Sequence, residues 1–369
     1  MTILNKTFKN KTVLITGDTG FKGGWLAIWL NLLGAKVVGL SIDIPSKPSN
    51  YEASEIKNFV KENWIDIQDS AAVRKVVQKF QPDFVFHLAA QALVRSSYEN
   101  PLKTFNTNAM GSINLLDALR SIKKNVVAIM ITSDKAYENV EWAWGYRESD
   151  RLGGKDPYSA SKGMAELAIR AYTESFFNNM DSNVSIGITR AGNVIGGGDW
   201  AKDRIVPDCI KAWSNNESVD IRNPRATRPW QHVLEPLSGY LLLATNLAQS
   251  RNNHGQAYNF GPSSKNNYSV GYLINEMARS WDKALWNDIS NDQEYSYEAA
   301  LLKLNCDKAL FDLEWSPTLE FEETVKMTTE WYKNYYKSHN SSMYDFTISQ
   351  IMEYTSLAEL RNMKWASND

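Results

Sequence analysis

The sequence predicts an α/β protein with a doubly wound parallel sheet, followed by a smaller mixed C-terminal lobe. Three observations predict this fold class. Short apolar stretches alternate with amphipathic ones through the first half of the chain. A glycine-rich turn directly follows the first apolar stretch, and after about residue 195 the alternation becomes irregular. Near-continuous apolar strands between helices are typical of a parallel sheet that is covered on both faces.

The expected strands are short runs rich in valine, isoleucine and leucine, which suit a buried sheet. They cover residues 11–17, 35–41, 82–90, 125–133 and 184–194. The expected helices between the strands carry apolar residues at helical spacing. They cover residues 24–34, 70–80, 101–122 and 157–177.

Beyond residue 195, the pattern predicts helices separated by loops and short strands. These helices cover residues 204–215, 234–249, 270–281 and 320–340, and the end of the chain reads as an appended helical segment. We therefore expect a first domain at residues 1–194, a lobe at 195–340 that is interleaved with it, and a helical extension at 341–369.

Composition excludes several classes of protein. The 369 residues carry 40 Lys and Arg against 42 Asp and Glu, a net charge of −2, so we expect no nucleic-acid partner. The cysteines, Cys209 and Cys306, and the four histidines are scattered without metal-ligand spacing, so we expect no metal. The N-terminus is polar and no apolar run approaches the length of a membrane span. We therefore expect a cytoplasmic protein without a membrane partner.

The turn "ITGDTGFKG" places Gly17, Gly20 and Gly23 between the first strand and the first helix. Glycines here permit a tight turn and let the backbone approach a pyrophosphate, which the helix N-terminus attracts through its free N–H groups and its dipole. A merely structural turn is the alternative. The strand–turn–helix context favours a Rossmann-type dinucleotide-binding site.

The acidic residue that usually bonds the adenosine ribose at the end of the second strand is missing. Ser41 stands at that place, and Asp43 comes two residues later. Because no arginine lies there either, a 2′-phosphate has no obvious partner, and the pattern favours NAD over NADP, weakly bound. Stoichiometric, non-exchanging cofactor in the purified protein would contradict weak binding. Asp66 is placed to meet the adenine, or is simply a surface acid in a turn.

Tyr158 and Lys162 lie four residues apart on the helix expected to start near Pro157, with Asp156 as its N-cap, so both lie on one face. A phenol with a pKa near ~10 is a poor base at neutral pH. We expect the nearby ammonium group and a positive nicotinamide ring to lower the pKa of Tyr158. Such a tyrosine can take a proton from a sugar or alcohol hydroxyl while hydride leaves the same carbon. The Tyr-x-x-x-Lys spacing is common by chance, but together with the N-terminal glycine turn it is specific for an oxidoreductase site.

With these motifs, residues from about 11 to 330 resemble the extended short-chain dehydrogenase/reductase family. The motifs that carry the resemblance are "TGDTGFKG", "HLAAQ" (87–91), "NTNAMG" (106–111), "TSD" (132–134), "YSASK" (158–162) and "RAGNVIGGGDW" (190–200). Longer stretches resemble the nucleotide-sugar 4,6-dehydratases within that family, above all those that act on CDP-glucose. These stretches are "GFKGGWL" (20–26), "LVRSSYENP" (93–101), "TSDKAYENVEWAWGYRESD" (132–150) and "RNPRATRPWQHVLEPLSGYL" (222–241).

The resemblance implies an NAD-binding domain, a lobe that binds a nucleotide sugar, and a homodimer. The dimer would be a four-helix bundle of helices 101–122 and 157–177, with a tetramer as the larger alternative. Ser133, Tyr158 and Lys162 would form the catalytic set, and Asn108 would support a water or backbone network near the lysine. The cofactor contacts that it implies are Gly17, Gly20, Phe21, Lys22, Gly23, Ser41, Asp66, Ile67, Leu88, Ala89, Ala90, Gln91, Asn108, Tyr158 and Lys162.

A 4,6-dehydratase oxidises C4 of the hexose, eliminates water across C5 and C6, and reduces C6, so it needs an acid and a base beyond the tyrosine. In the dTDP-glucose enzymes of the family this pair is Asp–Glu, whereas here it is Asp134–Lys135. We expect Asp134 to protonate the departing C6 hydroxyl and Lys135 to take the C5 proton. A lysine is a base only when neutral: burial and neighbouring positive charge favour that form, and the adjacent carboxylate opposes it. The alternative is a solvated ion pair at a strand end.

Arginines are expected at the substrate diphosphate because guanidinium groups match phosphate oxygens. The expected substrate contacts are Arg95, Ser133, Asn193, Arg204, Arg222 and Arg228, of which Asn193 rests on the family match. Arg222 could equally be a solvated strand end, and Arg190 could be structural. Gly196 to Gly198 could approach the pyrophosphate or form a simple loop.

The main hypothesis is therefore an NAD-dependent hydro-lyase that converts CDP-D-glucose into CDP-4-keto-6-deoxy-D-glucose and water, in the deoxysugar biosynthesis that supplies lipopolysaccharide O-antigen. The choice of CDP rests on the resemblance alone. One alternative is an NAD-dependent nucleotide-sugar epimerase or reductase of the same fold, against which the Asp134–Lys135 pair speaks. The other is a non-catalytic dinucleotide-sensing protein, although such proteins often lose the Tyr–Lys pair that this chain keeps.

Overall fold

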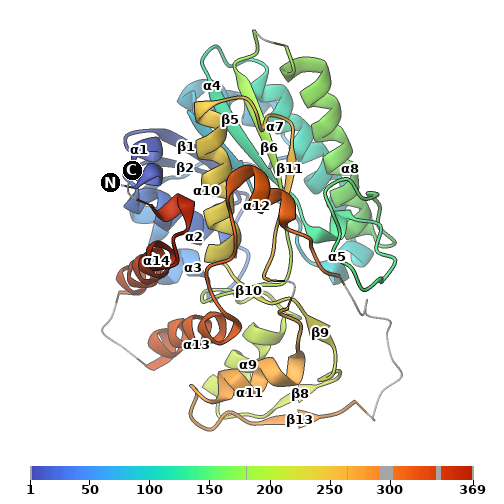
Figure 1. Ribbon diagram of the computed structural model, residues 1–369, viewed down its shortest axis with the longest axis vertical. Helices are drawn as coiled ribbons and strands as arrows, with labels where there is room; N and C mark the ends of the chain where they lie inside the picture. Colours follow the sequence, from blue (N-terminus) through green and yellow to red (C-terminus); the bar gives the residue numbers. More distant parts are fainter. Residues whose placement is uncertain (1, 180, 264, 291–301, 338–341, 368–369) are drawn as a thin grey trace.

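The computed structural model describes residues 2–179, 181–263, 265–290, 302–337 and 342–367. Within these residues, a sheet of seven parallel strands forms the core of the larger part of the molecule (Figure 1), in the order β11-β6-β5-β4-β1-β2-β3. Its strands are β1 (Thr12–Thr16), β2 (Lys36–Leu40), β3 (Val60–Lys61), β4 (Phe84–His87), β5 (Val126–Ile131), β6 (Val184–Ala191) and β11 (Ala257–Phe260). The Rossmann-type doubly wound sheet predicted from the sequence is confirmed.

The strand order reverses next to β1, which lies between β2 and β4. Val13 pairs with Val37 on one side and with Phe84 on the other. From β1 the chain builds outward through β2 and β3, and then crosses to β4, β5 and β6. In such sheets the crevice at the carboxyl ends of the strands beside the reversal is the usual ligand site. The glycine turn, which follows β1, lies at this crevice.

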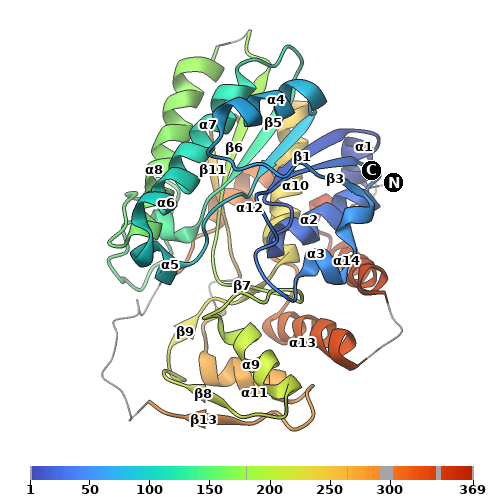
Figure 2. The same cartoon turned by 180° about the vertical axis from the view of Figure 1, so that it is seen from behind.

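Helices cover both faces of the sheet, as the views in Figures 1 and 2 show. Alternate strand residues point to opposite faces, so Ile15 and Ile129 pack with the helices α2 and α10, whereas Leu14 and Met130 pack with α4, α7 and α8. These helices are α2 (Phe21–Leu32), α4 (Ser70–Phe80), α7 (Gly111–Leu119), α8 (Pro157–Tyr172) and α10 (Leu234–Gln249). Shorter elements of the first half are α1 (Ile3–Phe8), α3 (Asn50–Ala53), η1 (Ile56–Asn58), α5 (Val94–Glu99) and η3 (Asp134–Ala136).

The helix predicted at residues 101–122 is divided into three pieces. These are α6 (Pro101–Phe105), a π-helical turn η2 (Asn106–Met110) and α7. Single π turns inside helices often mark functional sites. The predicted helix 157–177 likewise consists of α8 followed by a π-helical turn, η4 (Thr173–Phe177). Periodicity alone does not detect such turns, because one extra residue per turn leaves the apolar pattern on either side intact.

Beyond β6 the chain forms a smaller lobe, below the sheet in Figure 1. It contains α9 (Ile205–Ser214), α11 (Val270–Ala278) and three two-stranded pairings, β10–β7, β12–β9 and β13–β8. The strands are β7 (Val194–Ile195), β8 (Val219–Ile221), β9 (Thr227–Arg228), β10 (Gln231–His232), β12 (Tyr268–Ser269) and β13 (Trp286–Asp288). Between these segments α10 and β11 return to the large sheet, so the chain crosses between the two parts more than once.

The C-terminal elements are α12 (Asp307–Leu313), α13 (Phe321–Lys337), α14 (Met343–Leu360) and η5 (Lys364–Ala366). The helix α14 packs against α2, where Asn31 Nδ2 donates to Tyr344 Oη at 2.7 Å and the Trp29 ring lies 5.9 Å from that of Tyr354. Residues 338–340 at the end of the predicted helix 320–340, and the predicted boundary at 340/341, lie outside the described residues. In the part of the chain that the structure describes, no helix combines the length and the apolar character that crossing a bilayer requires.

Candidate active site

The glycine turn leaves backbone exposed where a side chain would not fit. Gly17 has a φ of +76°, and a β-carbon on it would lie 2.8 Å from the Ala89 nitrogen. A β-carbon on Gly23 would lie 2.1 Å from the Gly17 oxygen. Gly20, the N-cap of α2, supplies no side chain to the free N–H groups of the first helical turn. The turn therefore fits a pyrophosphate bound at a helix N-terminus.

Two acidic side chains that sequence reasoning missed lie behind this turn. Ser41 Oγ donates to Asp18 Oδ1 at 2.7 Å. A β-carbon on Gly39 would lie 2.5 Å from Asp18 Oδ2 and 2.6 Å from Glu62 Oε2, so the two carboxyl groups meet above this glycine. Burial raises the pKa of Glu62 to about 8, and the nearby Asp18 adds to the shift. Asp18 belongs to the glycine motif itself, whereas nothing in the sequence around Glu62 signals the pairing.

Asp66, the predicted adenine contact, and Ile67, another predicted cofactor contact, lie in the turn before α4. Asp66 is half-buried and accepts hydrogen bonds from Gln68 N at 2.9 Å and Gln68 Nε2 at 3.2 Å. Ile67 is buried against Gly111, on which a β-carbon would lie 2.7 Å from Ile67 Cγ2. The Ile67 carbonyl accepts a bond from Asn114 at 3.0 Å.

Residues 88–91, which follow β4, are half-buried along the same crevice. Asn108, in the π-helical turn η2, joins this segment to α8. Its Oδ1 accepts from Gln91 N at 2.8 Å, and its Nδ2 donates to Ser161 Oγ at 2.8 Å. Ser161 Oγ donates in turn to the Tyr158 carbonyl at 2.7 Å. The predicted network around Asn108 thus connects the helix of Tyr158 and Lys162 to the end of β4.

The helix α8 begins as predicted, with Pro157 in its first turn and Asp156 accepting a hydrogen bond from Ser159 N at 3.0 Å. Tyr158 and Lys162 are both buried on it. Burial lowers the pKa of Lys162 to about 8, and Glu166 opposes this shift. Burial raises the pKa of Tyr158 to about 12, so the predicted lowering is wrong for the chain on its own. Desolvation of the phenolate outweighs the contact with Ser133, which acts in the predicted direction.

Ser133, Asp134 and Lys135 form the turn where β5 leaves the sheet. Ser133 Oγ donates to Asp134 Oδ1 at 2.8 Å and accepts from Lys135 N at 3.2 Å. Asp134 is 4 % exposed, and burial raises the pKa of its carboxyl group, opposed by the neighbouring charge of Lys135. Among the described residues no ion pair joins Asp134 to Lys135. The alternative of a solvated ion pair is therefore wrong.

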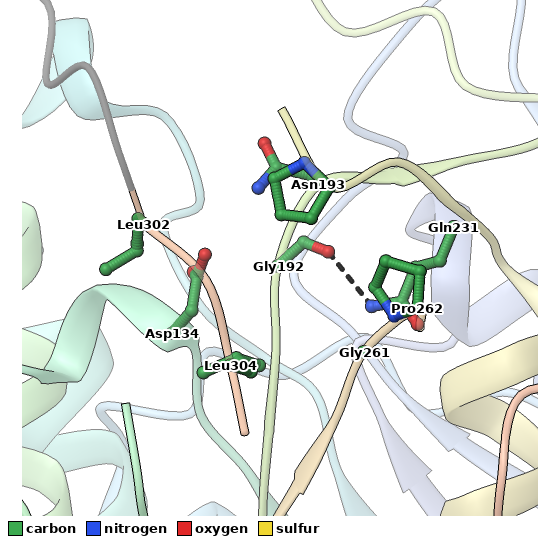
Figure 3. Close-up of a pocket in the computed structure, with 9 residues that line it drawn as sticks. Asp134, Gly192, Asn193, Gln231, Gly261, Pro262, Leu302 and Leu304 are labelled. Carbon is green, nitrogen blue, oxygen red and sulfur yellow. Dashed lines mark hydrogen bonds between the residues drawn. The ribbon is translucent and has the colours of Figure 1, made fainter. Parts of the chain in front are cut away.

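Asp134 lines a small pocket between the sheet and the lobe, drawn in Figure 3. The free volume of the pocket is about 10 Å³, close to the space that one water molecule occupies. Asn193, a predicted substrate contact, also lines it and has a φ of +49°. The other lining residues are Gly192, Pro229, Gln231, Gly261, Pro262, Leu302 and Leu304.

Two residues of the glycine motif reach toward this region. Burial lowers the pKa of Lys22 to about 8, and the charges of Asp134 and Lys162 act on it in opposite directions, so its ammonium group lies near both. Phe21 Cζ would lie 3.1 Å from a β-carbon on Gly196. The first turn of α2 therefore connects the predicted cofactor crevice to Asp134 and Lys162.

The four predicted arginines are placed differently. Arg204 Nη1 binds Asp199 Oδ2 at 2.7 Å, and its charge opposes the rise in the pKa of Tyr158, so Arg204 lies near Tyr158. Arg95 is exposed, and its Nη1 lies 3.6 Å from Asp203 Oδ1. Arg222 is exposed and Arg228 is half-buried. The structure thus brings one of the four arginines next to Tyr158.

Arg190, whose role the sequence left open, is a structural residue. It is fully buried, and its Nε donates to Glu166 Oε1 at 2.6 Å while Nη2 also bonds Glu166. Its Nη1 donates to Tyr137 Oη at 2.6 Å. Glu166 follows Lys162 by one turn of α8, so this ion pair holds the helix against β6 and against the segment after Lys135.

Comparisons with known proteins find nucleotide-sugar 4,6-dehydratases among the relatives of this chain. The profile of a protein family described as GDP-mannose 4,6-dehydratase matches residues 14–328. A CDP-glucose 4,6-dehydratase of Salmonella typhimurium is 44 % identical over 336 residues, which cover 90 % of this chain and 93 % of that protein. A dTDP-glucose 4,6-dehydratase of Xanthomonas campestris is 26 % identical over 346 residues, covering 87 % and 93 %.

Solved structures share the fold at lower identity. A UDP-glucuronic acid 4-epimerase from Bacillus cereus, in complex with UDP-glucuronic acid and NAD, has a TM-score of 0.73 at 23 % identity and covers 88 % of this chain and 99 % of its own. The dTDP-glucose 4,6-dehydratase DesIV from Streptomyces venezuelae, with NAD bound, has a TM-score of 0.71 at 19 % identity, covering 88 % and 97 %. At these identities the likeness establishes the fold.

Proposed function

The chain belongs to the family described as GDP-mannose 4,6-dehydratase, and on this premise we propose that it is an NAD-dependent hydro-lyase acting on CDP-D-glucose. The products are CDP-4-keto-6-deoxy-D-glucose and water. The observation that carries the proposal is the buried acid Asp134 beside Lys135, in addition to the Tyr158–Lys162 pair. An epimerase or reductase needs only the second pair. The choice of CDP-glucose is supported by the 44 % identity to a CDP-glucose 4,6-dehydratase.

The residues present fit NAD. Gly17 and Gly23 leave room for a pyrophosphate that a β-carbon would fill, and Lys22 extends from the same turn. Bound NAD would supply the hydride acceptor for C4 of the hexose and the hydride donor for C6. The site offers Asp18 and Glu62 near the position where an acid usually bonds the adenosine ribose, and no arginine for a 2′-phosphate is apparent beside Ser41 in the sequence. The remaining cofactor contacts that we propose are Gly20, Phe21, Ser41, Asp66, Ile67, Leu88, Ala89, Ala90, Gln91 and Asn108.

In C4 oxidation, Tyr158 takes the proton of the C4 hydroxyl. The Ser133 hydroxyl group contacts Tyr158 and opposes the rise of its pKa, so it would help to position the phenol. The Lys162 ammonium, one turn further along α8, favours the phenolate. Both side chains are buried, so water is excluded from this proton transfer.

In the elimination, the C5 proton goes to Lys135 and the C6 hydroxyl leaves as water with the proton of Asp134. Because burial raises the pKa of Asp134, this carboxyl group can hold a proton at a pH where an exposed aspartate could not. Arg204, with Arg95, Arg222, Arg228 and Asn193, would bind the nucleotide diphosphate and sugar. The position of Arg204 beside Tyr158 supports its part in this set.

We further propose a homodimer that buries the exposed apolar side chains of α6 and α8. Leu102 on α6 is 79 % exposed and Leu167 on α8 is 58 % exposed, and Met164 joins them. The two helices lie side by side on the outer face of the molecule (Figure 2). Two copies of this face would give a four-helix bundle, and a tetramer would need a further contact.

The remaining proposals concern location and organisation. We place the reaction in the cytoplasm, in deoxysugar biosynthesis for lipopolysaccharide O-antigen. We also propose that the chain divides into an NAD-binding part (1–194), an interleaved nucleotide-sugar lobe (195–340) and a helical extension (341–369). The returns of α10 and β11 to the sheet support the interleaving.

The decisive experiment is an assay with CDP-glucose and NAD, in which a 4-keto-6-deoxy sugar is detected by its absorbance in alkali. The dTDP-, UDP- and GDP-linked hexoses are tested in parallel. We expect the product from CDP-glucose. If product formed only from another nucleotide sugar, the assignment of CDP as the nucleotide would be wrong. If the sugar were epimerised or reduced, or if no product formed, the assignment of 4,6-dehydration would be wrong.

A further inference from the structure

Gln231 lines the same pocket as Asp134, and its carboxamide is fixed by the ends of two strands (Figure 3). Its Nε2 donates to the Gly192 carbonyl, just after β6, and to the Phe260 carbonyl, at the end of β11, both at 3.0 Å. Carbonyl oxygens only accept, so these two bonds establish which end of the amide is nitrogen. Both amide hydrogens are used, and Oε1 is the remaining polar atom.

Gln231 Oε1 is buried and has no hydrogen-bond partner among the described residues. The residue is 2 % exposed, so bulk water does not satisfy this acceptor. An unpaired buried acceptor is unfavourable, so this atom favours a ligand that donates to it. The side chain therefore offers a single, rigidly held acceptor, and the pocket that it lines is about 10 Å³, the size of one hydroxyl group or water.

Gly192 connects this acceptor to the acid. Its carbonyl accepts the bond from Gln231, and its α-carbon lies against the Asp134 carboxyl group. The same pocket is thus lined by a proton donor, Asp134, and by the residue that carries the unpaired acceptor, Gln231. A glutamine suits this place better than a carboxylate would, because a neutral amide neither competes for the proton of Asp134 nor repels its conjugate base.

We propose that Gln231 binds the C6 hydroxyl of the hexose and holds it for departure, an inference that rests on the proposed function. The O6–H bond donates to Gln231 Oε1, which turns a lone pair of O6 toward Asp134. Asp134 then gives its proton to O6, the C6–O bond breaks as the C5 proton passes to Lys135, and C5 and C6 become joined by a double bond. The oxygen leaves as water, which donates one hydrogen bond to Gln231 Oε1 and the other to the Asp134 carboxylate.

The test compares two leaving groups in the full-length protein with NAD. CDP-glucose loses water, whereas CDP-6-deoxy-6-fluoroglucose loses fluoride and has no O6–H to donate. We expect Gln231→Met to slow elimination from CDP-glucose on the order of tenfold to a hundredfold, as loss of one buried hydrogen bond would. We expect release of fluoride to be unchanged or faster. Equal loss with both substrates, or no loss with CDP-glucose, would overturn the proposal.

A third substrate separates this proposal from the proposed function. CDP-6-deoxyglucose has no leaving group and reports C4 oxidation alone, through the appearance of NADH. If the wild-type protein does not oxidise it, the proposed function fails. If wild type and Gln231→Met oxidise it equally, the fold and the cofactor site of the variant are intact.

Gln350→Met is the matched control. Gln350 is also 2 % exposed, donates through Nε2 to the Met327 carbonyl at 2.8 Å and has an unpaired Oε1, but it lies on α14. It should leave the ratio of the two elimination rates at the wild-type value. Should Gln231→Met fail to fold, Gln231→Asn keeps an amide and withdraws the oxygen by one methylene, and the same split between substrates is expected.

Discussion

The carboxyl group of Asp134 lies so close to Gly192 that a β-carbon on residue 192 would be 1.9 Å from Asp134 Oδ2. Residue 192 must therefore lack a side chain for Asp134 to keep its place. We predict that Gly192→Ala lowers the rate of 4-keto-6-deoxy product formation at least about tenfold, by displacing the acid, and leaves NADH formation from CDP-6-deoxyglucose intact. Gly163→Ala is the control, since a β-carbon there would be 3.5 Å from its nearest neighbour. Wild-type turnover in Gly192→Ala would show that Asp134 is not the acid.

The role of Lys135 can be separated from that of Tyr158 by isotope exchange. With CDP-glucose deuterated at C5, Lys135→Met should retain the deuterium, because no base removes it, while hydride transfer from C4 stays measurable. Mass spectrometry of the recovered sugar gives the deuterium content. Lys123→Met, at an exposed position, should behave as wild type. Unchanged turnover in Lys135→Met would reject the assignment of the base.

The carboxyl pair Asp18–Glu62 predicts a pH dependence of stability. The pKa of Glu62 is raised from its usual 4.5 to about 8, so the folded state keeps a proton that the unfolded chain has lost in this range. Unfolding then releases a proton, and the free energy of unfolding contributed by Glu62 falls as the pH rises from about 4.5 to about 8. Glu62→Gln removes this titration. Its urea-unfolding free energy should fall less than that of wild type between pH 5 and pH 8.5.

Glu217→Gln, at an exposed position, is the control for that experiment. Its unfolding curves should follow those of wild type at every pH. If Glu62→Gln also follows wild type across the range, Glu62 is not protonated in the folded protein, and the two carboxyl groups do not share a proton.

Removing one member of the buried ion pair Arg190–Glu166 should strongly lower the free energy of unfolding. Arg190→Met leaves the Glu166 carboxylate buried without its partner, so we expect a loss of about 3–5 kcal/mol in the free energy of unfolding. Arg74→Met removes the exposed pair with Asp117 and should cost less than about 1 kcal/mol. Denaturant titration measures both. The double variant Arg190→Met/Glu166→Gln should recover part of the loss, and a loss no larger than that of Arg74→Met would refute the account.

The proposed dimer predicts a charge-sensitive surface on α8. Leu167→Glu places a carboxylate in the centre of the proposed four-helix bundle, where its desolvation would oppose association. We expect the dimer to dissociate into monomers in analytical ultracentrifugation. Leu360→Glu changes an even more exposed leucine on α14 and should leave the mass unchanged. A monomeric wild type, or a dimeric Leu167→Glu, would place the interface elsewhere or remove it.

Local patterns were sufficient to predict much of this molecule. Five strands of the large sheet, the helices between them and the glycine turn follow from nearest neighbours in the sequence, whereas the edge strands β3 and β11 were not predicted. The N-cap at Asp156 also follows from near neighbours, because it depends on residues within one turn. The break in the helix at 101–122 was missed, since it depends on Asn108 bonding to Gln91 and Ser161, which are distant in sequence.

In the candidate site too, features that depend on nearby residues were predicted, and features that depend on distant residues were missed. Tyr158 and Lys162 could be paired because they lie one turn apart on a helix. Glu62 and Gln231 carried no such signal: one meets Asp18 across Gly39, and the other reaches the ends of β6 and β11. For the chain on its own, the predicted direction of the Tyr158 pKa shift was also wrong, because burial depends on the whole fold.

The position of β11 and α14 has a consequence for synthesis on the ribosome. The edge strand β11 pairs with β6, although it follows it by more than sixty residues, and α14 at the end of the chain covers α2 near its beginning. A nascent chain released only as far as β6 would expose the apolar outer side of α2 and an unpaired strand edge. The sheet from β1 to β6 and the helix α2 can therefore be fully covered only after β11 and α14 have been synthesised, and this part of the protein would be a natural client for chaperones in that interval.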